Sequence, residues 1–306
     1  MNPRGIEPLE DSDIAEASVS PPPPPGIRAS SLLTRASRLW RTRLGLILVG
    51  ALVLLAIIGP YVAPYGPSTP VGVPNSVPGS KALLGTDYLG QDVLSRLLYG
   101  GRSILVMAII ATALGMIVGA AIGLLAAYSR NVLDDVLMRG MDVIMAFPQI
   151  MLALVAVAIV GPHAWVIVAA IALTTAPRIA RVARGAAQPV VERDFIACSE
   201  AMGVPRWQIL GTELLPNTLG PLMVEASLRV TYSIGVIAAL AFLGLSPNPN
   251  AANWGTMIQE NQLALSVQPW GVVAPVIAIA LLTMGTGLIG DGIARTAAGI
   301  DRARSE

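Results

Sequence analysis

The stretch Ser103–Tyr128, which reads SILVMAIIATALGMIVGAAIGLLAAY, contains no charged residue and decides the fold class. A helix needs about 20 predominantly apolar residues to cross about 30 Å of hydrocarbon, because each residue rises about 1.5 Å. This stretch is long enough, so it predicts a helix that passes from one side of a membrane to the other.

Five further stretches meet or approach the same requirement, which predicts an all-α membrane protein with about six transmembrane helices. The fourth of the six spans is the weakest, because Arg178 and Arg181 crowd its end and Pro177 could kink or terminate it. The five further spans are Leu44–Val62, Val143–Val160, Trp165–Ala180, Leu219–Leu245 and Gly271–Gly290.

The composition agrees with lipid as the solvent for most of the chain. Of 306 residues, 54% are hydrophobic and 13% are charged, about half the charge of a soluble domain. The single cysteine, Cys198, excludes an intrachain disulfide, and the single lysine, Lys81, lacks the glycine-rich frame of a phosphate-binding loop. The one histidine, His163, is expected in an exposed turn and makes neither a metal site nor a catalytic triad. Neither ATP hydrolysis nor a metal site is therefore expected on this chain.

The arginines fix an expected orientation. With the N-terminus inside, sixteen of the twenty basic residues lie in cytoplasmic segments, as the positive-inside rule requires. Both termini are then cytoplasmic. Residues 1–43 are expected to form a disordered tail, stiffened by the run Pro21–Pro25, and residues 293–306 form a second cytoplasmic tail.

The outside loop of about residues 65–102 changes character at its end. Asp92 and Arg96 stand at positions i and i+4, and the apolar residues between and after them recur at helical spacing. This pattern predicts a short amphipathic helix that lies at the outer membrane face. Its apolar residues are Val93, Leu94, Leu97 and Leu98.

A second long loop, residues 188–217, interrupts the expected five-helix core of residues 103–292 on the cytoplasmic side. It is far longer than a bare connection between spans four and five needs. Gly203 can adopt the left-handed conformation that ends a helix, and Pro205 sits where a new helix would begin. The pattern predicts a helix, a sharp turn and a second helix. An amphipathic connector that rests on the membrane surface is the alternative interpretation.

Two features indicate how the spans pack. Gly115, Gly119 and Gly123 recur every four residues on the second span and give a stripe where another backbone can approach closely, although glycine is also simply frequent in membrane helices. Glu225 and Arg229 lie one turn apart on the fifth span and can pair, so they must face protein or water. They either line a pathway or form an internal structural salt bridge.

The loop around Gly203 resembles the cytoplasmic signature of the permease subunits of ABC importers. That signature reads Glu-Ala-Ala, three residues, Gly, nine residues, Ile, one residue, Leu-Pro. Gly203 and Leu215-Pro216 match at the correct spacing. The loop departs from the signature at four positions, with Ala197 for glutamate, Cys198 and Ser199 for the two alanines, and Glu213 for isoleucine.

Further motifs in the correct order narrow the resemblance to the second permease of dipeptide, oligopeptide and nickel importers, over roughly residues 32–302. The stretch Leu84–Arg102 is similar to that family's signature Gly-Thr-Asp-x-x-Gly-Arg-Asp-x-Leu-Ser-Arg, with Gln91 in place of its usual arginine. The other similar stretches are Asp134–Pro148, Phe242–Leu245, Trp254–Met257 and Leu288–Gly292.

The resemblance implies the type I ABC importer permease fold and a role as the transmembrane permease subunit of an importer for di- or oligopeptides or similar small solutes. It implies a homologous second permease, two ABC ATPase subunits or one fused ATPase, and an extracytoplasmic substrate-binding protein as partners. ATP and Mg²⁺ would bind to the ATPase subunits, and no nucleic acid is implied. The residues implied to dock the ATPase are Phe195, Ala197, Cys198, Ser199, Ala201, Met202, Gly203, Pro205, Leu215 and Pro216.

The alternative from another class is a secondary carrier driven by an ion gradient. Such carriers usually need carboxylates inside the membrane or broken helices at corresponding places in two repeats. Apart from Glu225, which Arg229 offsets, the centres of the spans lack acidic residues. The sequence therefore favours the importer permease.

Overall fold

The computed structural model describes residues 34–129, 132–248 and 251–297. The predicted N-terminal tail lies outside these residues up to position 33, and so do residues 298–306 of the C-terminal tail. The helices, in chain order, are α3 (Trp40–Val62), α4 (Val93–Ser129), α5 (Val132–Met145), α6 (Gln149–Val160), α7 (Ala164–Val191), α8 (Asp194–Ala201), α9 (Arg206–Gln208), the π-helix η1 (Ile209–Leu214), α10 (Leu215–Phe242), α11 (Trp254–Asn261), the short 3₁₀-helix η2 (Gln262–Ala264) and α12 (Trp270–Ala297).

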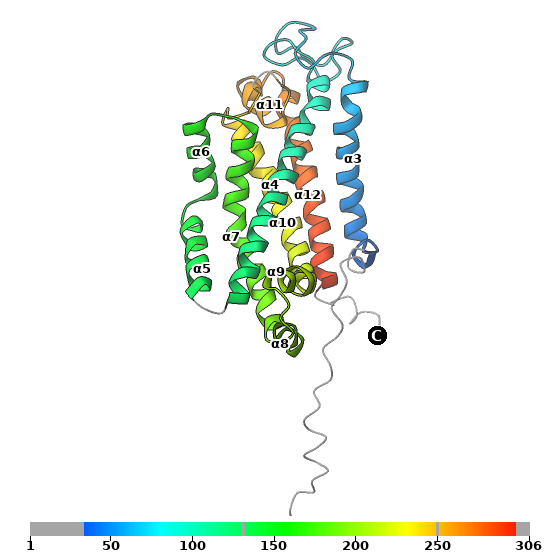
Figure 1. The fold of residues 1–306 in the computed structure, drawn as a ribbon. Helices are drawn as coiled ribbons and strands as arrows, with labels where there is room; N and C mark the ends of the chain where they lie inside the picture. The colour runs from blue at the N-terminus through cyan, green and yellow to red at the C-terminus, as the bar shows by residue number, and fades with distance from the viewer. Residues whose placement is uncertain (1–33, 130–131, 249–250, 298–306) are drawn as a thin grey trace, which may run out of the picture.

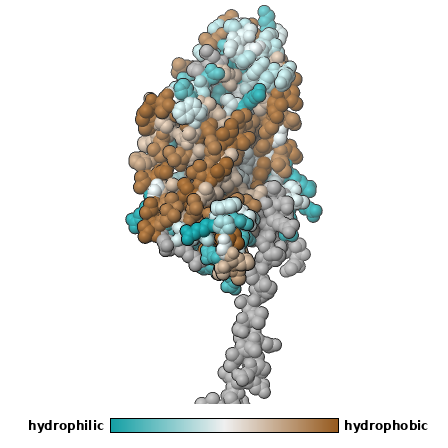
Figure 2. Space-filling model, in the orientation of Figure 1, coloured by the Kyte–Doolittle hydropathy of each residue, from teal (hydrophilic) through white to brown (hydrophobic). Residues whose placement is uncertain are grey.

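Long apolar helices lie side by side and form the body of the molecule (Figure 1). Five segments of the described chain are long and apolar enough to cross a membrane, namely α3, α4, α7, α12 and the run from α9 through α10; the bent pair α5 and α6 adds a sixth candidate. Figure 2 shows an apolar belt between two more polar ends. The predicted all-α membrane fold with about six transmembrane helices is confirmed.

The two ends of this bundle differ. The first turn of α3, the last turn of α12, and α8 and α9 lie at one end, which we call the α8 end (Figure 1). At the other end, called the α11 end, α11 lies beside the segment that connects α3 to α4 (Figure 1). Each end therefore carries one of the two long loops that the sequence predicts.

The glycine stripe of α4 packs against α7. An added Cβ at Gly115, Gly119 or Gly123 would collide with α7, at Thr175, Ala176 and Ala180 respectively. A bare backbone at these three positions lets the two helices approach closely, as small residues do in membrane helix pairs. α10 packs against α4, α7 and α12, while α3 packs along α12 at the edge of the bundle.

The amphipathic helix expected at the outer membrane face is not a separate element. The predicted stretch forms the first turns of α4, which runs without a break into the second span. Val93 and Ser95 are fully buried there, and the indole of Trp254 from α11 covers Gly100 and Gly101. The apolar face that predicted a lipid contact is therefore used for packing within the protein.

The third and fourth spans also differ from the prediction. The third is divided at residues 146–148 into α5 and α6, whose axes are bent by 81°. The fourth does not end at Ala180, because α7 continues through Pro177 to Val191. Arginine side chains on this extension pair with α5: Arg184 contacts Asp134 with Nε–Oδ1 2.7 Å and Nη2–Oδ2 2.5 Å, and Arg181 contacts Asp142. Paired with carboxylates, these arginines do not terminate the helix.

Candidate functional site

The loop at the α8 end begins with a short helix that a glycine turn ends. Gly203 has φ of +75°, in the left-handed region. The amide of Gly203 donates to the carbonyl of Glu200 at 3.0 Å, and the amide of Val204 donates to the carbonyl of Ser199 at 3.1 Å. This pair of bonds is the Schellman motif that closes a helix C-terminus. The sharp turn predicted at Gly203 is present, and Pro205 follows it as the N-cap of α9.

α8 presents one face to the body of the molecule and the other to the surroundings. Ile196 is 1% exposed and packs with Ile209 and Leu214 of η1 and with residues of α4 and α7. Phe195 and Met202 are 40% and 75% exposed. Of the residues predicted to dock a partner, Leu215 packs inward and Ser199 is buried. The exposed ones are Phe195, Ala197, Cys198, Ala201, Met202, Gly203, Pro205 and Pro216.

A hydrogen bond that the sequence did not suggest joins the two halves of the loop. The hydroxyl of Ser199 on α8 donates to Oε1 of Glu213 on η1 at 2.8 Å. Both residues stand where the importer signature has apolar residues. Two departures from the signature therefore form one contact, which fixes α8 against η1.

The second predicted helix of the loop is not an independent unit. α9 passes into the six-residue π-helix η1 and then into α10 without a break. The loop between spans four and five is therefore shorter than residues 188–217, because its first residues belong to α7 and its last to α10. π-helical turns are rare and occur often at functional sites. A displacement of α8 would act directly on the start of α10.

The predicted pair on α10 is formed. Nε of Arg229 lies 2.7 Å from Oε1 of Glu225, and each side chain is 11% exposed. The guanidinium also lies 5.8 Å from the centre of the Tyr232 ring. Arg229 and Tyr232 line an open groove of about 750 Å³ between α10 and α12, which also reaches Asp291.

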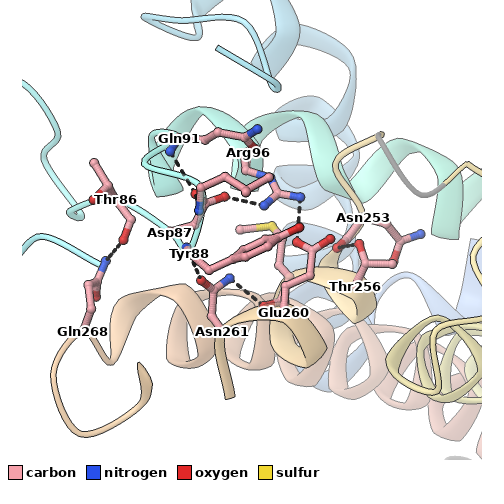
Figure 3. Close-up of polar contacts among 12 residues, drawn as sticks. Thr86, Asp87, Tyr88, Gln91, Arg96, Asn253, Thr256, Glu260, Asn261 and Gln268 are labelled. Atoms are coloured by element: carbon pink, nitrogen blue, oxygen red, sulfur yellow. Dashed lines mark hydrogen bonds and ion pairs between the residues drawn. The ribbon is translucent and has the colours of Figure 1, made fainter. Parts of the chain in front are cut away.

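A buried polar cluster at the α11 end was not predicted as a unit (Figure 3). Arg96 of α4 contacts Asp87 through Nη1, and its Nη2 lies 2.9 Å from Oε2 of Glu260 on α11. Asp92, one turn before Arg96, accepts instead from the amide and hydroxyl of Ser95 at 2.9 and 2.6 Å. Asp87 and Arg96 belong to the motif quoted from the sequence, whereas nothing in the sequence singled out Glu260.

The described residues give no sign of a metal centre. They contain no group of three or more His, Cys, Asp or Glu side chains placed to hold an ion. His163 is the exposed residue before the first turn of α7. The features that remain as candidates are the loop at the α8 end, the groove on α10 and the cluster at the α11 end.

Comparisons with known proteins identify the family of this chain. The family model described as "Binding-protein-dependent transport system inner membrane component" matches residues 119–297. The chain is 36% identical over 259 residues to the di/tripeptide transport system permease protein DppC of Pseudomonas aeruginosa, covering 81% of this chain and 84% of that protein. The chain belongs to the family of binding-protein-dependent transport system inner membrane components.

Other relatives are also transport permeases. The permease is 34% identical over 278 residues to the glutathione transport system permease protein GsiD of Pectobacterium atrosepticum, covering 88% of this chain and 92% of that protein. Among solved structures, the inward-facing MetNI methionine ABC transporter is similar with a TM-score of 0.49 and 21% identity, over 64% of this chain and 95% of that chain.

Family membership determines the role of the chain. It is a multi-pass inner membrane protein and the permease subunit of an ABC importer. It is a transport subunit and not an enzyme, because ATP hydrolysis in this family belongs to separate subunits. The family also supports the type I importer permease fold and does not favour the ion-driven carrier.

Proposed function

We propose that this permease and a homologous second permease form the pathway by which di- or oligopeptides, or similar small solutes, cross the inner membrane. The observation that carries the proposal is the glycine-turn loop at the signature spacing, on a chain 36% identical to a di/tripeptide permease. The groove beside Arg229 and Tyr232 supplies a partly polar wall between two spans, and we assign it to the pathway.

The charges support an orientation with the α8 end in the cytoplasm. Among the described basic residues, the α11 end exposes only Lys81 and Arg102, since Arg96 is buried. By the positive-inside rule the arginine-rich end is cytoplasmic, and with it both termini. The exposed arginines at the α8 end include Arg35, Arg38, Arg43, Arg139, Arg181, Arg193, Arg206 and Arg295.

In the proposed orientation, the two ends of the molecule meet different partners. Two ATPase subunits, or one fused ATPase, bind ATP and Mg²⁺ and dock on the exposed face of α8 around Phe195 and Met202. A substrate-binding protein docks at the α11 end. Closure of the ATPase upon ATP displaces α8, and η1 transmits the displacement to α10. For such coupling the loop must bind the ATPase with different affinity in the two states, since equal affinity would shift nothing.

Gly203 offers the sharpest test of docking. A Cβ at Gly203 meets no atom within 4 Å, so Gly203→Val acts through its positive φ alone. A left-handed residue with a β-branched side chain costs roughly 1–2 kcal/mol or more and would shift the turn. We expect Gly203→Val to insert normally but to lose ATP-driven peptide uptake in proteoliposomes with its partners.

The matched control is Gly185→Val, since Gly185 lies within α7 and also faces open space. It should retain uptake. Normal uptake and normal ATPase stimulation by Gly203→Val would show that this turn does not dock the ATPase. Uptake that depends on a proton gradient without ATP would overturn the importer assignment itself.

A further inference from the structure

The cluster at the α11 end is built across three parts of the chain (Figure 3). We call residues 70–92 the cap segment. Within it, the amide of Val71 donates to the carbonyl of Gly90 at 2.8 Å, and the amide of Asn75 donates to the carbonyl of Asp87 at 2.8 Å. Arg96 belongs to α4 and Glu260 to α11. The contacts of Arg96 with Asp87 and Glu260 therefore join the cap segment, α4 and α11 at one point.

Neutral hydrogen bonds run beside this ionic contact. The amide of Tyr88 donates to Oδ1 of Asn261 at 3.1 Å. The side-chain amide of Gln268 donates to the carbonyls of Leu84 at 2.7 Å and Thr86 at 3.2 Å. These bonds join the cap segment to the last residue of α11 and to the chain that follows it, so they would break if α11 and that chain moved away from the cap segment.

The charges in this cluster do not balance. One guanidinium, 3% exposed, faces two carboxylates, with the Asp87 side chain fully buried and that of Glu260 13% exposed. Burial raises the pKa of Glu260, and the nearby charge of Asp87 raises it further, while Arg96 opposes both. Buried ion pairs often contribute less stability than apolar packing of the same volume would. The strength of this contact therefore depends on the charge of each of its three members.

We propose that Arg96 is a positioning residue of transport: it holds α11 against the cap segment in a closed state that has the contacts described here, and the charge on Glu260 sets how firmly it does so. The inference rests on the function proposed above, in which the α11 end faces outward and docks the substrate-binding protein. The titratable groups that face Glu260 are Arg96 of α4 and Asp87 and Tyr88 of the cap segment. Asp92 is turned toward Ser95.

The direction of the pH effect follows from the raised pKa. A carboxyl group with a higher pKa in the closed state than in the open state binds a proton more tightly when closed. Acid therefore stabilises the closed state, since neutral Glu260 no longer has to be desolvated as a charge. As the outside pH rises above the ordinary range of glutamate, near 4.5, the closed state loses this stabilisation.

The first experiment measures hydrogen exchange at the Tyr88 amide, in the assembled transporter in lipid nanodiscs, over about pH 4.5 to 7. After correction for intrinsic exchange, protection in the unaltered protein should fall as pH rises. Glu260→Gln should keep high protection at every pH, because its side chain is neutral throughout. Arg96→Met should lose protection roughly a hundredfold, since it leaves two carboxylates facing each other without a cation.

Two further variants keep the test decisive. Arg96→Lys retains the charge but cannot contact both carboxylates through a planar fork, so its protection should be intermediate. Lys81→Met removes an exposed cation from the same segment and should behave as the unaltered protein. The proposal is overturned if Glu260→Gln keeps the pH dependence of the unaltered protein, or if Arg96→Lys exchanges as slowly as the unaltered protein.

Uptake assays separate this proposal from the assigned function. With partner subunits present, ATP-driven uptake by the unaltered protein should rise as the outside pH rises through this range, and Glu260→Gln should remove that dependence. No uptake of any peptide would contradict the proposed function and leave the exchange result to decide the role of Arg96. A pH-dependent uptake that Glu260→Gln does not change would contradict the role of Arg96 alone.

Discussion

Ser199 and Glu213 show how a single contact can explain two unusual residues. Each alone looks unfavourable in a close-packed loop, but the hydroxyl of Ser199 and the carboxylate of Glu213 satisfy each other at 2.8 Å. We expect Ser199→Ala and Glu213→Ile each to lower stability, because each leaves the other polar group without its partner. The double variant, which restores the signature residues, should recover, with a coupling free energy of about 1 kcal/mol.

Thermal unfolding of the four proteins in detergent measures this coupling, and ATPase stimulation shows whether it reaches the docked partner. Thr212→Ala is the control, since the hydroxyl of Thr212 is exposed and bonds only to the carbonyl of Gln208 in its own turn. Additive losses in the double variant would mean that the two side chains act independently.

At the scale of the element, the packing of α4 against α7 depends on the missing side chains of its glycines. A Cβ at Gly119 would lie 2.5 Å from the carbonyl oxygen of Ala176 and 2.7 Å from Cβ of Ile179. Because backbone cannot give way as a flexible side chain can, Gly119→Ala should destabilise the protein by about 1–3 kcal/mol.

The control for this substitution is Gly50→Ala on α3, where an added Cβ meets nothing within 4 Å. The same change should there be neutral or stabilising by up to about 1 kcal/mol, because alanine favours the helix. The midpoint of unfolding in a detergent series compares the two variants. Equal midpoints would show that the seam between α4 and α7 tolerates a larger separation.

The elements also show what a sequence can and cannot predict. Apolar runs of about 20 residues located every span, because the hydrophobic length of a helix is a local property. The ends of the spans were misplaced wherever a distant partner decides them. Beyond Ala180, Arg181 and Arg184 of α7 pair with Asp142 and Asp134 of α5, so these charges do not mark the end of the span, and Trp254 covers the first turns of α4.

In the candidate site, too, the sequence predicted the local features and missed a contact between distant residues. The turn at Gly203 follows from one residue and its spacing, so the sequence contained it. The contact of Arg96 with Glu260 joins residues far apart in the chain, and no local pattern distinguishes Glu260 from a solvent-exposed glutamate. Such contacts depend on how the helices assemble, which periodicity and composition do not specify.

At the scale of the whole molecule, the orientation can be measured with its only cysteine. Cys198 is exposed on α8, and the proposed topology places it in the cytoplasm. A membrane-impermeant maleimide should therefore leave it unlabelled in intact cells and label it in inverted vesicles. Leu263, which is 96% exposed beside α11, supplies the opposite marker. Leu263→Cys in a Cys198→Ser background should be labelled from outside the cell and not in sealed inverted vesicles.

A docked ATPase should change the labelling of Cys198 and leave the labelling of Leu263→Cys unchanged. If α8 is the docking element, labelling of Cys198 in inverted vesicles should rise when the ATPase is stripped from the membrane, whereas labelling of Leu263→Cys should not change. Labelling of Cys198 in intact cells would reverse the topology, and with it the assignment of the α11 end to the substrate-binding protein. Equal labelling of Cys198 with and without the ATPase would keep the topology but place the docking surface elsewhere on the α8 end.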